Sequence, residues 1–297
     1  MPIALELLRL LPRNLLSRGA GRLASLRLPR PLVRAEIALF ARAVGADLGE
    51  VRDPVDSFAS LQDFFVRALR EGARPVAPEP DAVVAPCDGA WGESGVVADG
   101  RLLQVKGRPY ALADLVDSKA DSAELEGGCF ATFYLAPRDY HRFHAPCDAR
   151  VESTRYVPGT LWPVNRIGLD GVEGLFAQNE RLAVRMRARP GDALLCVVAV
   201  GATLVGKVRV EFDSLVTNPA GGAGRAARVP RGRRARQGPG VGPVRVRLDA
   251  GAGRGARRAR ARRAAAGDAP APRRAHRAAA SARVTLRTKT AAQAPME

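Results

Sequence analysis

The last 79 residues of this 297-residue sequence contain no phenylalanine, tyrosine, tryptophan or isoleucine. Arg, Ala, Gly and Pro fill most of this tail, residues 219–297, so it cannot bury enough apolar surface to offset the entropy lost on folding. We expect the tail to be disordered, which excludes a second domain with its own core. One folded unit of roughly 220 residues remains, and that length is sufficient for a hydrophobic core.

Acidic residues are also scarce in the tail, and this scarcity sets the net charge of +17. Residues 1–218 carry 27 basic and 27 acidic side chains, whereas residues 219–297 carry 20 and 3. An arginine-rich segment attracts polyanions, so a nucleic-acid arm or an anionic-lipid tether is compatible with the composition. The tail lacks the aromatic side chains that stack on bases, and we therefore expect no specific nucleic-acid partner.

Cysteine and histidine are few and widely spaced. The chain has four cysteines with no C-x-x-C pair and three histidines: Cys87, Cys129, Cys147, Cys196, His141, His144 and His276. These spacings do not match those of zinc sites, and we expect no metal. Because no apolar leader segment precedes the cysteines, a reduced cytosolic compartment is favoured.

No stretch of the sequence is long and apolar enough for an uncharged membrane span. Residues 1–50 instead show helical spacing of apolar residues with arginines between them, and Pro31 separates a first helix from a second that runs through Ile37 to Val44. Two interpretations remain open. The pattern alone favours helices packed on their own domain, and the alternative is basic amphipathic helices that lie in a membrane interface.

The rest of the folded unit changes from helix to strand. Residues 58–69, FASLQDFFVRAL, predict a short amphipathic helix, and from about Val83 short β-like runs are separated by Gly, Pro and Asp. We expect an α+β fold in which N-terminal amphipathic helices precede a mainly antiparallel β-rich core. The expected division is 1–50 for the helices, 51–218 for the core and 219–297 for the tail.

Two segments carry residues suited to catalysis. His141 and His144 lie in YLAPRDYHRFHAPCD, a proline-bounded loop after an apolar run, where a scaffold can position groups for proton transfer. The alternative is a solvated loop with incidental histidines. Asp88 in APCDG is typical of a turn when taken alone, but beside a histidine it could orient and stabilise an imidazolium. A nucleophile is missing, because Ser94 lacks the second glycine of a nucleophile elbow.

Eight segments together resemble bacterial phosphatidylserine decarboxylase. In chain order they are FASLQDFFVRAL, EGARPV, APCDG, QVKGRPYAL, YLAPRDYHRFHAPC, YVPGTLWPVN, LFAQNERLAV and VAVGATLVGKV, and the resemblance covers nearly everything from Phe58 to Phe212. The resemblance implies a lyase that converts phosphatidylserine to phosphatidylethanolamine and CO2. It favours the membrane interpretation of residues 1–50, as a peripheral protein at the cytoplasmic face of the cell membrane, with phosphatidylserine and an anionic membrane surface as partners.

The family's chemistry assigns roles to the candidate residues. Its members are zymogens in which a serine of a Gly-Ser-Thr motif attacks the preceding glycine's carbonyl, and the chain is cleaved into a large chain and a small one that begins with a pyruvoyl cofactor. The pyruvoyl ketone forms a Schiff base with the substrate amine and accepts electrons as CO2 leaves. The family's serine-activating acid and histidine match Asp88 and His144. His141 matches its other loop histidine, a candidate proton donor after decarboxylation.

This sequence departs from the family in the tail, where Gly-Ser-Thr is absent and no serine anywhere follows a glycine; Ser281, the tail's single serine, follows Ala280. With synonymous codons chosen for Arg236 to Gly251, a frame moved one base downstream reads AKGQEWGRFEFGSTL, the missing family motif. We infer a single-base frameshift between about Asn218 and Arg225, with the serine encoded across Leu248 and Asp249.

The literal chain is therefore expected to be inactive, without a pyruvoyl group. It is also expected to be poorly stable, with exposed sheet edges, because the strands that should follow Phe212 are lost. The alternative is a non-catalytic relative that keeps the fold for lipid or polyanion binding.

Overall fold

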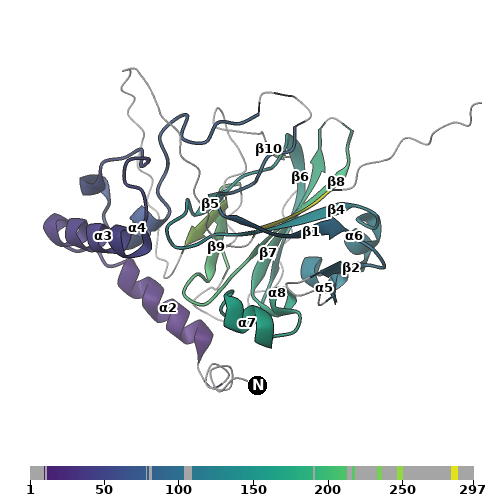
Figure 1. The fold of residues 1–297 in the computed structure, drawn as a ribbon, viewed down its shortest axis with the longest axis horizontal. Coiled ribbons are helices and arrows are strands. Elements are labelled where there is room, and N and C mark those ends of the chain that lie inside the picture. Colours follow the sequence, from purple (N-terminus) through teal and green to yellow (C-terminus); the bar gives the residue numbers. More distant parts are fainter. Residues whose placement is uncertain are drawn as a thin grey trace, which may run out of the picture.

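The computed structural model describes residues 10, 12–77, 79, 82–103, 109–189, 191–212, 216–217, 233–235, 246–249 and 282–286. It contains helices and antiparallel sheets, which confirms a mixed α+β fold (Figure 1). No helix of the described segments is long and apolar enough to cross a membrane.

The N-terminal part is helical. Its elements are α2 (Arg13–Ala24), α3 (Arg30–Val44), the 3-10 turn η1 (Val55–Ser57) and α4 (Leu61–Phe65). Pro31 lies in the first turn of α3, where a missing N–H costs no helical hydrogen bond, and Gly45 ends the helix at φ +75°. Ile37 of α3 is fully buried and packs with Phe64 of α4 in a small apolar cluster. Figure 1 shows α3 and α4 at one edge of the molecule.

A seven-stranded antiparallel sheet forms the centre, in the order β1-β4-β12-β8-β7-β6-β10. Its strands are β1 (Ala90–Val96), β4 (Cys129–Tyr134), β6 (Ala149–Val157), β7 (Arg181–Ala188), β8 (Leu194–Val200), β10 (Arg233–Ala235) and β12 (Ala282–Leu286). A second sheet joins β5 (Arg142–Phe143), β11 (Val246–Asp249) and β9 (Lys207–Val210), and a hairpin-like pair joins β2 (Arg101–Leu103) and β3 (Pro109–Ala111). The other helices of the described segments are short: α5 (Leu112–Val116), α6 (Lys119–Glu124), α7 (Arg166–Gly171) and α8 (Leu175–Gln178).

Both faces of the large sheet are covered. Every residue of β8 is buried, and because strand side chains alternate, Leu195 and Val197 enter one core while Cys196 and Val198 enter the other. The first core includes buried residues of β5 and β9, and the second includes those of α5 and α8. This explains why the LLCVVAV run has no polar alternation.

Three short segments of the tail are strands. β12 pairs along its whole length with β4 on one side and β8 on the other, β11 joins β5 to β9, and β10 lies beside β6. Strands after Phe212 are thus present, contrary to the expectation that they are lost, and disorder does not extend through the whole tail. The rest of the expected disordered segment lies outside the described residues.

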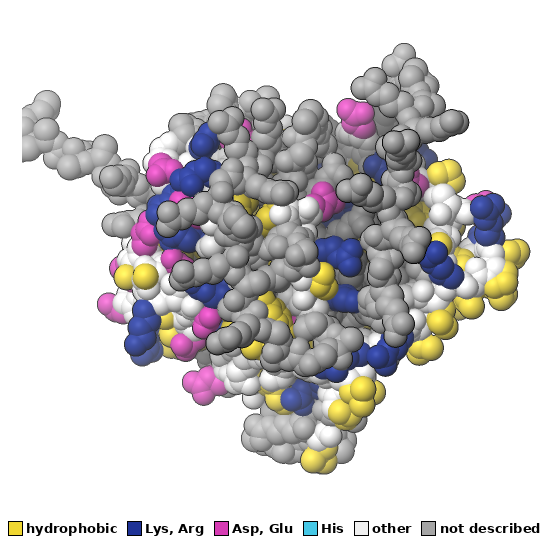
Figure 2. All heavy atoms as spheres, turned by 180° about the vertical axis from the view of Figure 1, so that it is seen from behind, with side chains coloured by type: hydrophobic (Ala, Val, Ile, Leu, Met, Phe, Trp, Pro, Cys, Tyr) yellow, Lys and Arg dark blue, Asp and Glu magenta, His cyan; other side chains and the backbone are white. Residues whose placement is uncertain are grey.

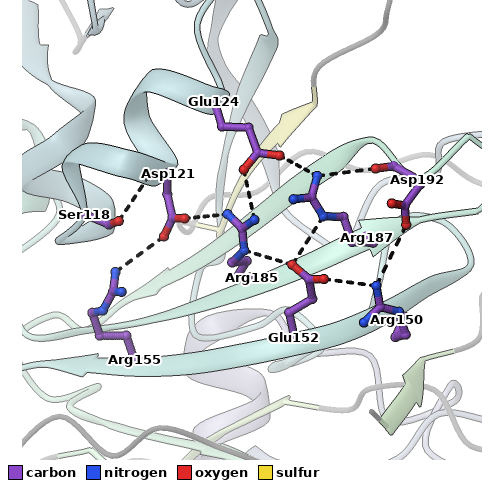
Figure 3. A network of polar contacts seen from close by, with 9 residues as sticks. All are labelled: Ser118, Asp121, Glu124, Arg150, Glu152, Arg155, Arg185, Arg187 and Asp192. Atoms are coloured by element: carbon purple, nitrogen blue, oxygen red, sulfur yellow. Dashed lines mark hydrogen bonds and ion pairs between the residues drawn. The ribbon is translucent and has the colours of Figure 1, made fainter. Parts of the chain in front are cut away.

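An ion network fastens α6 to the outer face of β6 and β7 (Figure 3). Arg185 at its centre donates to Glu152 and Glu124, at 2.9 Å each, and to Asp121. Arg187 on the same strand also donates to Glu152, at 3.3 Å. The side chains are only about one-sixth to one-third exposed, and a multidentate network of this kind is worth more than isolated surface pairs.

The LFAQNER motif holds loops together. Asn179 is fully buried, its Oδ1 accepts from the Trp162 backbone N at 2.8 Å, and its Nδ2 donates to the carbonyls of Trp162 at 2.9 Å and Gly201 at 2.8 Å. Arg181, also buried, donates only to backbone carbonyls, including that of Leu115 at 2.7 Å. Burial lowers its pKa to about 10. The motif thus has a structural role, connecting the 159–162 loop, α5 and the end of β8.

Replacing Asn179 by alanine tests this role. Asn179→Ala leaves three buried backbone groups without partners, so we expect the free energy of unfolding to fall by about 3 kcal/mol, at about 1 kcal/mol per group. Asn165→Ala is the control, because the Asn165 side chain makes one part-buried cap contact at the start of α7, for which about 1 kcal/mol is expected. Equal losses in urea titrations of the two variants would contradict the assignment.

Candidate functional site

The histidine loop follows β4 and is shaped by its own polar residues. The Asp139 carboxylate accepts from the backbone N of Ala136 and closes a turn after Pro137. His141 is 2% exposed, and its Nδ1 lies 3.0 Å from the carbonyl oxygen of Asp139. A carbonyl oxygen can only accept, so Nδ1 carries the proton and Nε2 of the neutral ring is the free lone-pair nitrogen. Burial lowers the pKa of His141 to about 4, so the ring is neutral at physiological pH.

The structure brings the segment that precedes Asp88 beside the segment that carries His144, although the two are far apart in sequence. The backbone N of His144 donates to the Pro86 carbonyl at 2.7 Å, and the backbone N of Val84 donates to the Pro146 carbonyl at 2.8 Å. The 84–88 and 143–146 segments therefore run side by side. The ring of Tyr140 is stacked on that of His144, with centroids 5.7 Å apart and planes 16° apart.

Arg74 holds the carboxylate of Asp88 in place. The sequence analysis did not identify Arg74 as a site residue. Its Nε and Nη2 donate to the two carboxylate oxygens of Asp88 at 2.8 Å each, and its Nη1 and Nη2 donate to Glu50 at 3.0 and 2.9 Å. These two carboxylates raise the pKa of Arg74 above its ordinary range, so it stays charged. The EGARPV segment, quoted for the family resemblance, was the signal that could have identified it.

Negative charges are close together in this region. Burial and the neighbouring Asp88 raise the pKa of Asp139 to about 6, against the opposing effect of Arg138, Arg67 and Arg74. Crowded, partly buried acids beside histidines are typical of sites that move protons near neutral pH. The described segments contain no group of three His, Cys, Asp or Glu side chains that could hold a metal ion.

The two residues whose codons would encode the serine in the shifted frame lie beside the histidine loop. Leu248 and Asp249 belong to β11, whose Val246 and Arg247 pair with Phe143 and Arg142 of β5, between the two histidines. On its other edge β11 pairs with β9. The backbone of β11 therefore lies next to the histidine loop, although the sequence has no serine at this position.

Gly89, directly after Asp88, is required by its surroundings. Its φ is +123°, and a Cβ added there would lie 2.4 Å from the carbonyl oxygen of Tyr134, the last residue of β4. The glycine lets the segment that carries Asp88, just ahead of β1, approach the start of the histidine loop at backbone distance.

Gly89→Ala tests that close approach against Gly72→Ala. Gly72 also has a positive φ, +77°, but a Cβ there would meet nothing within 4 Å. We expect the control to lose about 1 kcal/mol of stability from backbone strain, and Gly89→Ala to lose about 1–3 kcal/mol more from the clash. Chemical denaturation measures both, and indistinguishable midpoints would refute the requirement for backbone contact.

Comparison with known proteins shows the family of the chain. The family described as "Phosphatidylserine decarboxylase" matches residues 61–244. The chain is 47% identical over 220 residues to a phosphatidylserine decarboxylase proenzyme from Anaeromyxobacter sp. (strain K), covering 73% of this chain and 77% of that protein. Proenzymes of the same name from Acidovorax ebreus and Brevibacillus brevis are 42% and 37% identical, over 71% of this chain and 73% and 74% of their own lengths. The chain belongs to the phosphatidylserine decarboxylase family.

Proposed function

We propose that the uninterrupted form of this gene encodes a phosphatidylserine decarboxylase proenzyme, and that the present 297-residue chain is its inactive product. The substrate, phosphatidylserine, follows from the names of the relatives, and loss of its carboxyl group as CO2 gives phosphatidylethanolamine. Inactivity follows from the sequence, in which no serine is preceded by glycine.

One observation carries this proposal: β11 runs beside β5 between the two histidines. In the shifted reading frame the Gly-Ser dipeptide falls at the codons of Arg247 to Asp249. Arg247 is paired with Arg142, next to His141, in the antiparallel ladder. A serine at this point of β11 would therefore lie beside the histidine loop, where its hydroxyl needs a base.

Asp88 and His144 would activate that serine. His144 accepts the hydroxyl proton, and the carboxylate of Asp88 stabilises the imidazolium that results. Arg74 fixes the carboxylate from the other side through two hydrogen bonds of 2.8 Å. The guanidinium of Arg74 thereby fixes the orientation of the carboxylate that would stabilise the imidazolium.

The residues of the present chain do not provide for the pyruvoyl group. This group supplies an electron-withdrawing carbonyl in the family, and it must be made from a serine that follows a glycine. Ser281 follows Ala280, so the chain has no precursor for it. Asp88, His144 and His141 are thus a preserved site without its reactive centre.

Restoring the frame tests the proposal. The present chain should remain a single 31.6 kDa species, whereas the frame-restored protein should cleave itself into two chains and release CO2 from phosphatidylserine. In the restored protein, His144→Ala should slow self-cleavage by about 100-fold or more, because general-base assistance is lost. Denaturing gels and a carbonyl-reactive probe at the new N-terminus give the readout. Self-cleavage of the present chain, or a DNA sequence in which no single-base change restores the motif, would overturn the proposal.

We also propose that α2 and α3 lie on the anionic cytoplasmic face of the cell membrane. Seven leucines of residues 13–39 are exposed: Leu15, Leu16, Leu23, Leu26, Leu28, Leu32 and Leu39. Residues 13–44 carry seven arginines and a single acid, Glu36. In Figure 2 hydrophobic and basic side chains are interspersed along the right-hand edge and lower end of the molecule, where α3 and α2 lie. Exposed apolar residues among basic ones are the pattern of a helix in a lipid interface.

Vesicle binding tests the membrane contact. The chain should sediment with vesicles that contain phosphatidylserine more strongly than with phosphatidylcholine vesicles, and binding should weaken at high salt. Leu23→Gln combined with Leu39→Gln should reduce binding to anionic vesicles about tenfold or more, because about 0.8 kcal/mol is lost per CH2 withdrawn from lipid. Val96→Gln, an exposed apolar position on β1, is the matched control. Equal binding of the double variant and the control would refute the proposed face.

A further inference from the structure

The segment that ends α4 is in direct contact with His141. The Phe65 ring and the imidazole have centroids 4.0 Å apart and planes inclined by 39°. The next residue, Val66, accepts from Nε of Arg142 at 2.9 Å through its backbone carbonyl. Phe65 therefore contacts His141 itself, and Val66 contacts the residue that follows it.

Arg67 completes this contact from inside the protein. Its side chain is 3% exposed, and its Nη2 donates to the backbone carbonyl of Arg138 at 2.7 Å. The guanidinium also lies over the Phe64 ring at 4.9 Å. Residues 138 and 142, on either side of His141, are thus each tied to the α4 segment by one arginine hydrogen bond.

The buried charge of Arg67 is not explained by stability. Within the described part of the chain, Nε and Nη1 of Arg67 have no hydrogen-bond partner. Burial of a guanidinium with unused N–H bonds costs free energy, and an apolar side chain of similar length would fill the space without that cost. Burial also lowers the pKa of Arg67, although Asp88, Asp139 and Glu50 oppose that shift. What requires an explanation is the positive charge itself.

His141 is the group on which this charge acts. The charged groups that influence its ring are Arg67 and Asp88, and the Asp139 carbonyl accepts from Nδ1. Burial and Arg67 both disfavour the imidazolium, whereas Asp88 and the carbonyl favour it. If Arg67 were removed, burial alone would lower the pKa of His141, against the raising effects of Asp88 and the Asp139 carbonyl.

We propose that Arg67 is a positioning residue for His141: its hydrogen bond to the Arg138 carbonyl fixes the histidine loop, so that the imidazole stays packed on Phe65 with Nε2 free to accept a proton. The use of that nitrogen in decarboxylation rests on the proposed function. The protonation state does not, because it is a property of the present chain, which carries no reactive centre.

Histidine titration by NMR in the full 297-residue chain tests the proposal. The chain has only three histidines, so His144→Gln and His276→Gln assign the ring signals. Between pH 5 and 8 the His141 signal of the unaltered chain should not titrate. In Arg67→Met the midpoint should move upward by roughly half a unit or more, because a like charge is removed. Arg67→Lys, which keeps the charge and loses the planar fork, should restore the low midpoint.

Two outcomes would overturn the proposal. One is a His141 midpoint near 6.5 in the unaltered chain, and the other is the same midpoint in Arg67→Met as in the unaltered chain. A purely structural role would lower the melting temperature of the Met and Lys variants alike and leave the titration unchanged. The upfield shift that the Phe65 ring imposes on the His141 signal verifies that each variant keeps the loop in place.

The frame-restored enzyme provides an independent measurement. Arg67→Met should lower kcat with little change in KM and shift the acid limb of the pH profile, while Arg67→Lys should retain the limb of the parent. If the restored enzyme proves inactive, the proposed function fails while the titration result stands. An active enzyme whose pH profile is unaffected by Arg67→Met would refute the positioning role alone.

Discussion

The central sheet depends on a strand between β4 and β8. These two strands do not meet; each is hydrogen-bonded to β12, whose residues come from the far end of the chain. β8 is buried along its whole length, so unpaired N–H and C=O groups on its edge would be costly. Both hydrophobic cores pack against the sheet that this strand completes. In this structure the sheet is thus completed by a strand from outside residues 1–218.

The same strand connects the architecture to the site. β12 begins opposite Phe133, one residue before β4 ends and the histidine loop starts. Gly89 contacts the backbone at that end of β4, and Asp88 precedes it. The segment of the candidate acid and the histidine loop thus meet at the end of β4, the strand that pairs with β12. Arg74 connects the acid to Glu50 in the N-terminal part. Loss of register in the sheet would displace every candidate residue together.

Local patterns in the sequence predicted the elements of secondary structure but not the contacts between residues far apart in the chain. The α+β class and most strands were predicted, because apolar runs bounded by Gly and Pro carry that information. The helix expected over residues 58–69 ends at Phe65, because Val66 and Arg67 turn to hydrogen-bond the histidine loop. The three tail strands could not be predicted from an Arg- and Ala-rich composition, since their pairing partners lie far away in sequence. Asp88, His141 and His144 were identified from residue chemistry and the family resemblance, whereas the Glu50–Arg74–Asp88 ion pairs join residues with no common local pattern.

A strand held by hydrogen bonds on both edges has a mechanical consequence for the covalent chain that leads to it. Scission of the peptide bond ahead of such a strand removes one covalent link but none of the ladder that β4 and β8 offer. The two fragments would remain interlocked and would come apart only when the sheet itself melts. The sheet can thus tolerate a break in the backbone ahead of β12, because the pairing of that strand with β4 and β8 does not depend on the covalent link.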